Sequence, residues 1–266
     1  MAAIRTFTKS LFEVCAQKDF WLKVLGVVDG YEIWLVRTRE IYSFDHKDPR
    51  VLIVAGFHGE EVAGPWGILK WLKECDEGQL KTSVDVSVIP IVNPWGFAKG
   101  KRYGFSDMKT NHGFCHPEKN GTQTEPSPEG KILIDSMEFL RPLSQDGFLS
   151  LHEDKTVKEY YLYTFEHGSK PGKFTKSMKK ELSKHFLKSY DGIAYVDSKE
   201  KDSGPICKNG LVYRFCDGSF EDWIFHQGVP KVAVTETPGK YRLTRRINAN
   251  SKLIDKFIEL CRERNE

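Results

Sequence analysis

The chain has 266 residues, of which 39% are hydrophobic and 29% are charged, and this balance excludes an intrinsically disordered protein. A formal net charge of +3 is too small to indicate nucleic acid or an anionic membrane as the main partner. No apolar run reaches the ~20 residues needed to span a bilayer. The N-terminal segment mixes charged and apolar side chains, so we expect no signal peptide and a cytoplasmic location. Six scattered cysteines without a CxxC pair indicate reduced thiols.

Short β-branched runs alternate with helical stretches, which predicts an α/β fold. Strands are predicted over residues 21–28, 32–37, 50–56, 84–92, 147–151, 160–165 and 231–235. The Asp29-Gly30 pair between the first two predicts a hairpin. Helices are predicted over residues 3–16, 61–74, 128–140, 173–187 and 244–264, and long loops over 116–127 and 197–220. The sequence gives no indication of the oligomeric state.

Polar side chains follow four of the apolar strands. His58 and Glu61 come after the third strand, Asn93 after the fourth, His152 after the fifth and Glu236 after the last. In open α/β sheets, ligands bind outside the carboxyl ends of the strands. If these strands are parallel neighbours, the five side chains face one crevice.

This set has the chemistry of a catalytic metal site. Two imidazoles and one carboxylate, here His58, His152 and Glu61, are a zinc ligand set that leaves a fourth position for water. The three-residue spacing of His58 and Glu61 predicts a ligand on a turn and another one helical turn later. Glu236 is the candidate for the proton acceptor. Taken singly, each of these residues also fits a surface, capping or turn position, and the prediction depends on the joint pattern.

Five short motifs carry a family resemblance: GFHGEEVAG, NPWGF, SLHED, GSFEDW and VTETPG, in this order. They resemble the motifs of zinc carboxypeptidases of the pancreatic type, and the length resembles short bacterial members such as murein peptide amidase. The resemblance extends over residues 51–239. It implies a single catalytic domain over residues 1–266, a three-layer α/β/α sandwich with a mixed eight-stranded sheet, one zinc ion, and hydrolysis of a peptide amide bond near a free carboxylate.

The resemblance also assigns roles to individual residues. It implies that His58, Glu61 and His152 are the zinc ligands and that Glu236 is the general base. Arg102 matches the arginine that stabilises the oxyanion. Asn111 matches an asparagine that binds the terminal carboxylate of the substrate.

Three further assignments are less direct. Tyr213 matches the tyrosine that closes over the substrate, although a shift of one residue would put Arg214 there. His112 stands where the family has the arginine that clamps the carboxylate, and Lys101, Lys109 or Arg214 are alternative sources of that charge. Glu221 matches the floor of the specificity pocket, where an acid favours a basic side chain; the alternative is a solvated loop residue.

Two other functions fit the same residues. An N-acyl amino acid deacylase, of the type related to aspartoacylase and succinylglutamate desuccinylase, has similar metal ligands and base and acts on an acyl amino acid. A non-catalytic zinc-containing binding module would have no need of Glu236. In addition, His112, Cys115 and His116 lie close enough in sequence for a second soft-metal site, although their spacing is not a standard one.

Overall fold

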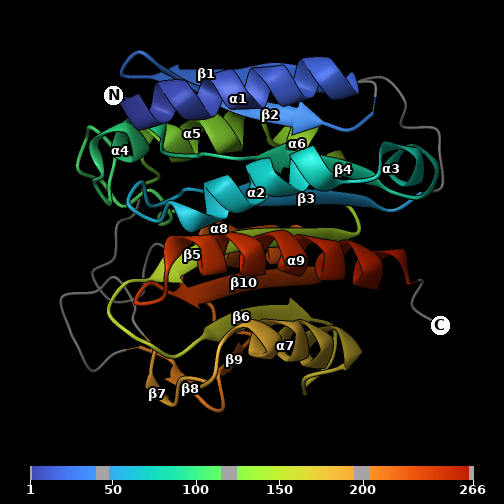
Figure 1. The fold of residues 1–266 in the computed structure, drawn as a ribbon. Helices are drawn as coiled ribbons and strands as arrows, with labels where there is room; N and C mark the ends of the chain where they lie inside the picture. Colours follow the sequence, from blue (N-terminus) through green and yellow to red (C-terminus); the bar gives the residue numbers. More distant parts are fainter. Residues whose placement is uncertain (1, 40–47, 115–124, 195–203, 264–266) are drawn as a thin grey trace.

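The computed structural model describes residues 2–39, 48–114, 125–194 and 204–263 (Figure 1). Cys115 and His116, proposed above for a second metal site, lie outside the described residues. Within the described residues the strands are β1 (Trp21–Val28), β2 (Tyr31–Arg37), β3 (Arg50–Ala55), β4 (Asp85–Ile89), β5 (Gly147–Asp154), β6 (Tyr161–Glu166), β7 (Gly192–Ile193), β8 (Ile206–Cys207), β9 (Leu211–Tyr213) and β10 (Lys231–Pro238). The helices are α1 (Ala2–Lys18), α2 (Ala63–Glu74), α3 (Glu77–Ser83), α4 (Pro94–Lys99), α5 (Pro128–Asp135), α6 (Met137–Leu143), α7 (Lys173–His185), α8 (Phe220–His226) and α9 (Leu243–Arg262).

Eight strands form one mixed sheet in the order β1-β2-β4-β3-β5-β10-β6-β9, and β7 pairs with β8 separately. The central strands β4, β3, β5 and β10 are parallel, so their carboxyl ends meet at one edge. The hairpin of β1 and β2 turns at Asp29 and Gly30, whose φ angles of 48° and 76° suit a tight hairpin turn and confirm the predicted turn.

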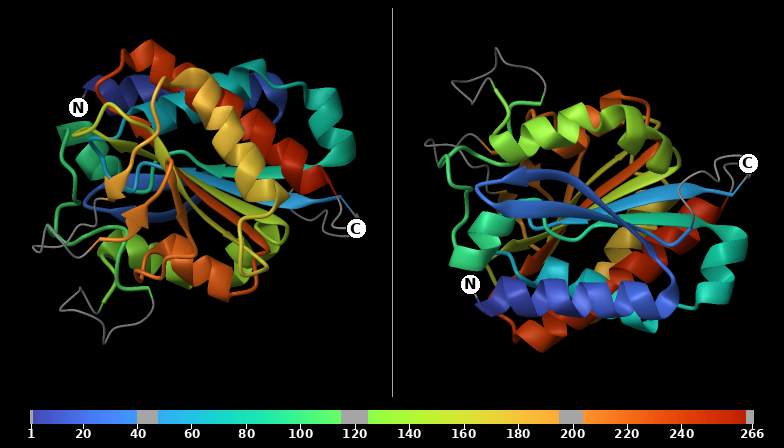
Figure 2. Two further views of the ribbon diagram at one scale, coloured as in Figure 1. Left: turned by 90° about the horizontal axis from the view of Figure 1, so that it is seen from below. Right: turned by 90° about the horizontal axis from the view of Figure 1, so that it is seen from above.

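Helices cover both faces of the sheet, which confirms the α/β/α arrangement (Figure 2). One hydrophobic cluster joins the sheet to α1, α2, α7 and α9, and a second joins the opposite face to α5, α6 and α8. Strands β3 and β5 are buried along almost their whole length, because each has neighbours on both edges and helices on both faces. This packing holds their carboxyl ends in fixed positions.

Several predicted boundaries differ from the structure. The helix expected to begin at residue 61 begins at Ala63, so Glu61 lies in the preceding turn and not one helical turn further on. The helix predicted over residues 128–140 is two helices, α5 and α6, which meet at Ser136. The fifth and last strands continue to Asp154 and Pro238, because their terminal polar residues pair with each other across the sheet. Part of the loop expected over residues 197–220 forms β8 and β9.

No described helix has the length and apolar character needed to cross a membrane. None of the five described cysteines forms a disulfide with another of them: Cys15, Cys75, Cys207, Cys216 and Cys261.

Candidate metal centre and active site

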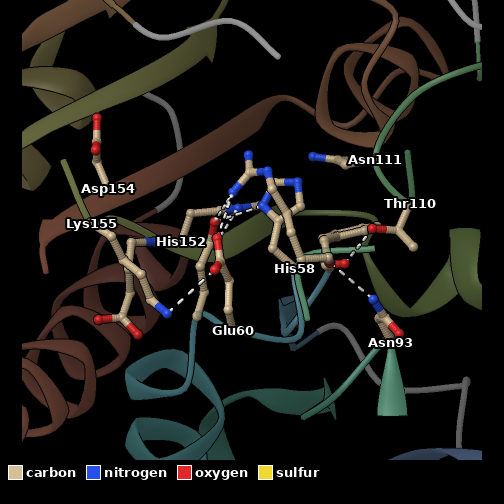
Figure 3. Close-up of polar contacts among 12 residues, drawn as sticks. His58, Glu60, Asn93, Thr110, Asn111, His152, Asp154 and Lys155 are labelled. Carbon is tan, nitrogen blue, oxygen red and sulfur yellow. Dashed lines mark hydrogen bonds and ion pairs between the residues drawn. The ribbon is translucent and has the colours of Figure 1, made fainter. Parts of the chain in front are cut away.

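Three ligand side chains converge at the carboxyl ends of β3 and β5. Two of them, His58 and His152, are labelled in Figure 3. His58 follows β3, Glu61 lies in the turn before α2, and His152 lies within β5. Gly59 in this turn packs directly against the backbone of α4: a Cβ there would lie 2.0 Å from the carbonyl carbon of Gly96. The chain therefore needs glycine between the histidine and the glutamate.

The carboxylate of Glu61 lies between the two imidazoles. Its Oε1 is 2.7 Å from His58 Nδ1 and its Oε2 is 2.9 Å from His152 Nδ1. One ligand atom from each residue lies within 4.8 Å of the others, and all three side chains are buried. Both histidines present Nδ1 to the same carboxylate. Two nitrogens and one carboxylate in this arrangement fit a divalent cation with an open coordination position.

The charges of these groups are strongly coupled. Burial acts to raise the pKa of Glu61, but His58 and His152 outweigh it and hold that pKa well below its usual range. Burial acts to lower the pKa of His152, but Glu61 and Glu221 hold it well above its usual value. For His58, burial prevails and lowers the pKa. These opposite shifts favour an ionised Glu61, a protonated His152 and an uncharged His58.

A second layer of contacts orients two of the ligands, Glu61 and His152. The backbone N–H of Glu153 donates to Glu61 Oε2 at 3.2 Å, and Arg102 Nη1 donates to Glu61 Oε1 at 3.0 Å. His152 Nε2 lies 3.3 Å from Glu221 Oε1, so a carboxylate holds the ring nitrogen that faces away from the cluster. Histidine ligands of protein-bound metals almost always have such a partner.

Arg102 reaches the cluster from the loop after α4. Its carbonyl accepts hydrogen bonds from the Asn93 side chain and from the Gly59 N–H, both at 3.1 Å. Asn93 was expected to face the crevice, but its side chain is fully buried and binds backbone groups on both sides, since Oδ1 also accepts from Gly96 N at 2.8 Å. Asn93 therefore positions Arg102.

Glu236 lies on β10 directly beside His152 of β5 in the parallel register. It lines the same cavity as the ligand cluster. Burial raises its pKa well above the usual value, with Glu61 and Asp154 adding to the rise. A bound cation has the opposite effect on a nearby carboxyl group and favours the ionised form.

Solved structures of similar proteins cover almost the whole chain. A protein described as a proposed metallopeptidase from Shewanella amazonensis SB2B is 34% identical, with a TM-score of 0.86 over 97% of this chain and 92% of that chain. A similarly described protein from Shewanella denitrificans OS217 is 33% identical, with a TM-score of 0.83 over 97% and 90% of the two chains. The chain belongs to the zinc carboxypeptidase-like family.

Two further comparisons match part of the chain or share its fold. Residues 47–130 match the model of the succinylglutamate desuccinylase/aspartoacylase catalytic domain. A metallo-carboxypeptidase from Burkholderia cenocepacia is 16% identical, with a TM-score of 0.65 over 95% of this chain and 67% of that chain, and shares the fold. No curated protein matches the chain.

In this carboxypeptidase-like chain, the ligand cluster opens into a cavity of about 190 Å³. Its walls include aromatic residues of β6, the acids Asp154 and Asp217, and the predicted residues Arg102, Asn111, His112, Glu221 and Glu236. Burial raises the pKa of Asp217 to about 6.

Asn111 and Glu221 hold each other in the wall of that cavity. Asn111 Nδ2 donates to Glu221 Oε2 at 2.8 Å, and Asn111 Oδ1 accepts from Phe220 N at 3.1 Å. Glu221 is only 1% exposed, so the solvated-loop alternative is wrong. Its two oxygens bind His152 and Asn111, and these contacts lower its pKa to about 2 although burial alone would raise it.

Tyr213 lies outside the cavity in this structure. Its hydroxyl lies 3.3 Å from the Glu166 carbonyl oxygen and 3.0 Å from that of Gly168, and its single proton is shared between them. Arg214 also donates to the Gly168 carbonyl, at 3.0 Å, and its guanidinium lies over the ring of Phe225. Neither side chain lines the cavity.

Sequence reasoning missed Glu153, whose buried carboxylate accepts from Ala63 N at 2.6 Å and pairs with Arg246. It links β5, α2 and α9 directly behind the ligands. Its position next to His152 in the SLHED motif was the available signal.

Proposed function

We propose that this protein is a zinc-dependent peptidase that hydrolyses an amide bond of a peptide, with residues 1–266 forming one catalytic domain. The observation that supports this best is the convergence of His58, Glu61 and His152 beside Glu236, which is in register with His152 at the same end of the sheet. Three ligands with a neighbouring carboxyl group form the minimal apparatus for activating water.

His58 Nδ1, His152 Nδ1 and the Glu61 carboxylate would hold the ion. When bound, zinc supplies Lewis-acid chemistry: it lowers the pKa of coordinated water and polarises the substrate carbonyl. Glu236 takes a proton from the attacking water and then returns it to the leaving amine. One carboxyl group on the cavity wall can perform both proton transfers. The Arg102 guanidinium, which contacts Glu61 at the edge of the cluster, donates to the oxyanion that develops on the substrate.

The substrate-binding roles follow from the cavity wall. His112 lines the cavity and would contact the substrate where the family has an arginine. Asn111 and Glu221 are already bonded to each other, so they would shape the wall and offer limited further hydrogen bonding. Tyr213 would have to leave two carbonyl groups before it closed over a substrate.

The second candidate function is deacylation of an N-acyl amino acid. The observation that favours it is the match of residues 47–130 to the succinylglutamate desuccinylase/aspartoacylase domain. That match includes His58, Glu61 and Arg102, so the same residues would act on a smaller substrate.

Parallel assays separate these functions. Zinc-loaded protein is incubated with a peptide library and with a panel of N-acyl amino acids, with the Glu236→Gln variant and a chelator-treated sample as controls. The proposal predicts release of amino acids or peptide fragments, a loss of about 10²–10⁴-fold in Glu236→Gln, and unchanged zinc content in that variant. Cleavage of acyl amino acids alone would establish the deacylase, and no turnover of either panel by fully zinc-loaded protein would favour a binding module.

A further inference from the structure

A second group of potential metal ligands lies in the segment of residues 216–226, in which Asp217, Ser219 and Glu221 line the cavity. In the described part of the chain, two groups bring ligand atoms within 4.8 Å of one another: the cluster described above, and Cys216, Asp222 and His226. Cys216 precedes α8, whereas Asp222 and His226 lie four residues apart on α8. The second group shares no residue with the first.

Local contacts hold Asp222 and His226 next to each other, and one ligand atom of Cys216 lies within 4.8 Å of theirs. Asp222 Oδ2 accepts from the Gly218 N–H at 3.0 Å, which turns Oδ1 towards His226. The His226 Nδ1 atom lies 3.1 Å from Asp222 Oδ1 and 2.8 Å from the Asp222 carbonyl oxygen. The turn is closed by Gly218, whose φ of 79° favours glycine.

Burial differs among the three residues in a way that suits ion entry. The Asp222 side chain is fully buried, the His226 side chain is 46% exposed, and Cys216 is exposed. Asp222 is thus a fixed ligand, while the two others can adjust at the surface. Tetrahedral Zn²⁺ with sulfur, nitrogen and oxygen ligands needs ligand atoms about 3.3–3.6 Å apart, a small movement for two exposed side chains.

We propose that Cys216, Asp222 and His226 form a second metal site, which binds a borderline divalent cation of the Zn²⁺ or Co²⁺ class. A thiolate and an imidazole select such ions over Mg²⁺ or Ca²⁺, which prefer oxygen ligands. With one carboxylate added, three protein ligands hold the ion and leave a fourth position for water.

The site has a structural consequence for the neighbouring cavity. Asp217 and Ser219 lie between the first two ligands and line the cavity of the first cluster. An ion held by Cys216 on one side and by α8 on the other would fasten this loop to the helix. The second site is independent of the proposed peptidase activity, because its ligands are other residues.

Cobalt spectroscopy distinguishes the two sites. The first cluster contains no sulfur, so a thiolate-to-cobalt charge-transfer band in the near-ultraviolet reports on the second site alone. Chelator-treated full-length protein is titrated with Co²⁺, and binding is followed by this band and by metal analysis. We expect the band in the wild type and in Glu61→Gln, which lacks a ligand of the first site.

Two surface substitutions test the ligands. Cys216→Ser should abolish the band, and His226→Gln should weaken Co²⁺ binding at this site about ten-fold or more, since even outer partners of metal ligands change affinity 10–100-fold. Cys75→Ser, at a half-buried cysteine outside the group, is the control and should keep the band. Absence of the band in the wild type, or a band that Cys216→Ser or His226→Gln leaves unchanged, would overturn the proposal.

Discussion

Substitution of Glu153 tests how much the buried ion pair behind the ligand cluster stabilises the fold. Its side chain is fully buried, and its carboxylate accepts from the first N–H of α2 at 2.6 Å and pairs with Arg246, whose side chain is 12% exposed. The Glu153→Gln variant keeps the shape of the side chain but removes its charge. Arg246 is then left as a largely buried cation without its partner.

The expected cost follows from that burial. Breaking a buried ion pair by removing one partner destabilises a protein by about 3–5 kcal/mol, and we expect about 3 kcal/mol because Arg246 retains some contact with water. For a chain of this size, each kcal/mol lowers Tm by about 2–4 °C, so Tm should fall by about 6–12 °C. Thermal melts followed by circular dichroism measure this on chelator-treated protein. The control Glu74→Gln removes a surface ion pair with Lys70 and should cost less than about 0.5 kcal/mol.

A double variant completes the cycle. Glu153→Gln combined with Arg246→Met removes both charges, so most of the lost stability should return. If Glu153→Gln melts within one degree of Glu74→Gln, the buried pair does not stabilise the fold as argued. If the double variant is as unstable as the sum of the two single variants, the cost does not arise from an unpaired charge.

Three further predictions concern the active site and the core. Arg102→Met should lower kcat/KM by about 10²–10³-fold with unchanged metal content, measured by turnover and metal analysis; an unchanged rate would exclude an oxyanion role. Gly59→Ala places a Cβ 2.0 Å from the Gly96 backbone and should cost about 3 kcal/mol or more in urea unfolding, whereas Gly78→Ala, 3.3 Å from a side-chain oxygen, should be mild. Burial raises the pKa of Cys15 from 9.0 to about 12, so the folded state favours the protonated thiol. Its alkylation by iodoacetamide at pH 8 should be far slower in the folded than in the urea-unfolded protein, and its contribution to stability should be lost as the pH rises from about 9 towards 12. Equal labelling in both states would contradict this.

The central strands and the ligands on them could be predicted because their signals are local. An apolar run followed by a polar residue marks the carboxyl end of a buried strand, and His58, His152 and Glu236 each stand at or just beyond such an end. Strand ends were predicted too early at Leu151 and Thr235, because pairing between β5 and β10 extends both strands through their polar residues.

Residues whose roles depend on distant partners could not be predicted in the same way. By sequence, Glu221 fits either the floor of a pocket or a solvated loop. Its contacts with His152 and Asn111 show that it is a buried residue, and that it orients the ligand His152. Glu153 carries no periodic signal that distinguishes it from a surface acid, since its partners lie on α2 and α9.

The sequence by itself determined the alternation of strands and helices, the hairpin at Asp29 and Gly30, and the set of side chains able to bind a metal. These properties rest on periods of two and 3.6 residues and on the conformational preferences of single residues. Only the tertiary structure decided which groups meet. The contact of His152 with Glu61 joins positions 91 residues apart, and the parallel pairing of β5 and β10 sets Glu236 beside His152. Such contacts depend on how whole layers pack, because the free energy that fixes them comes from burying the sheet between its helices.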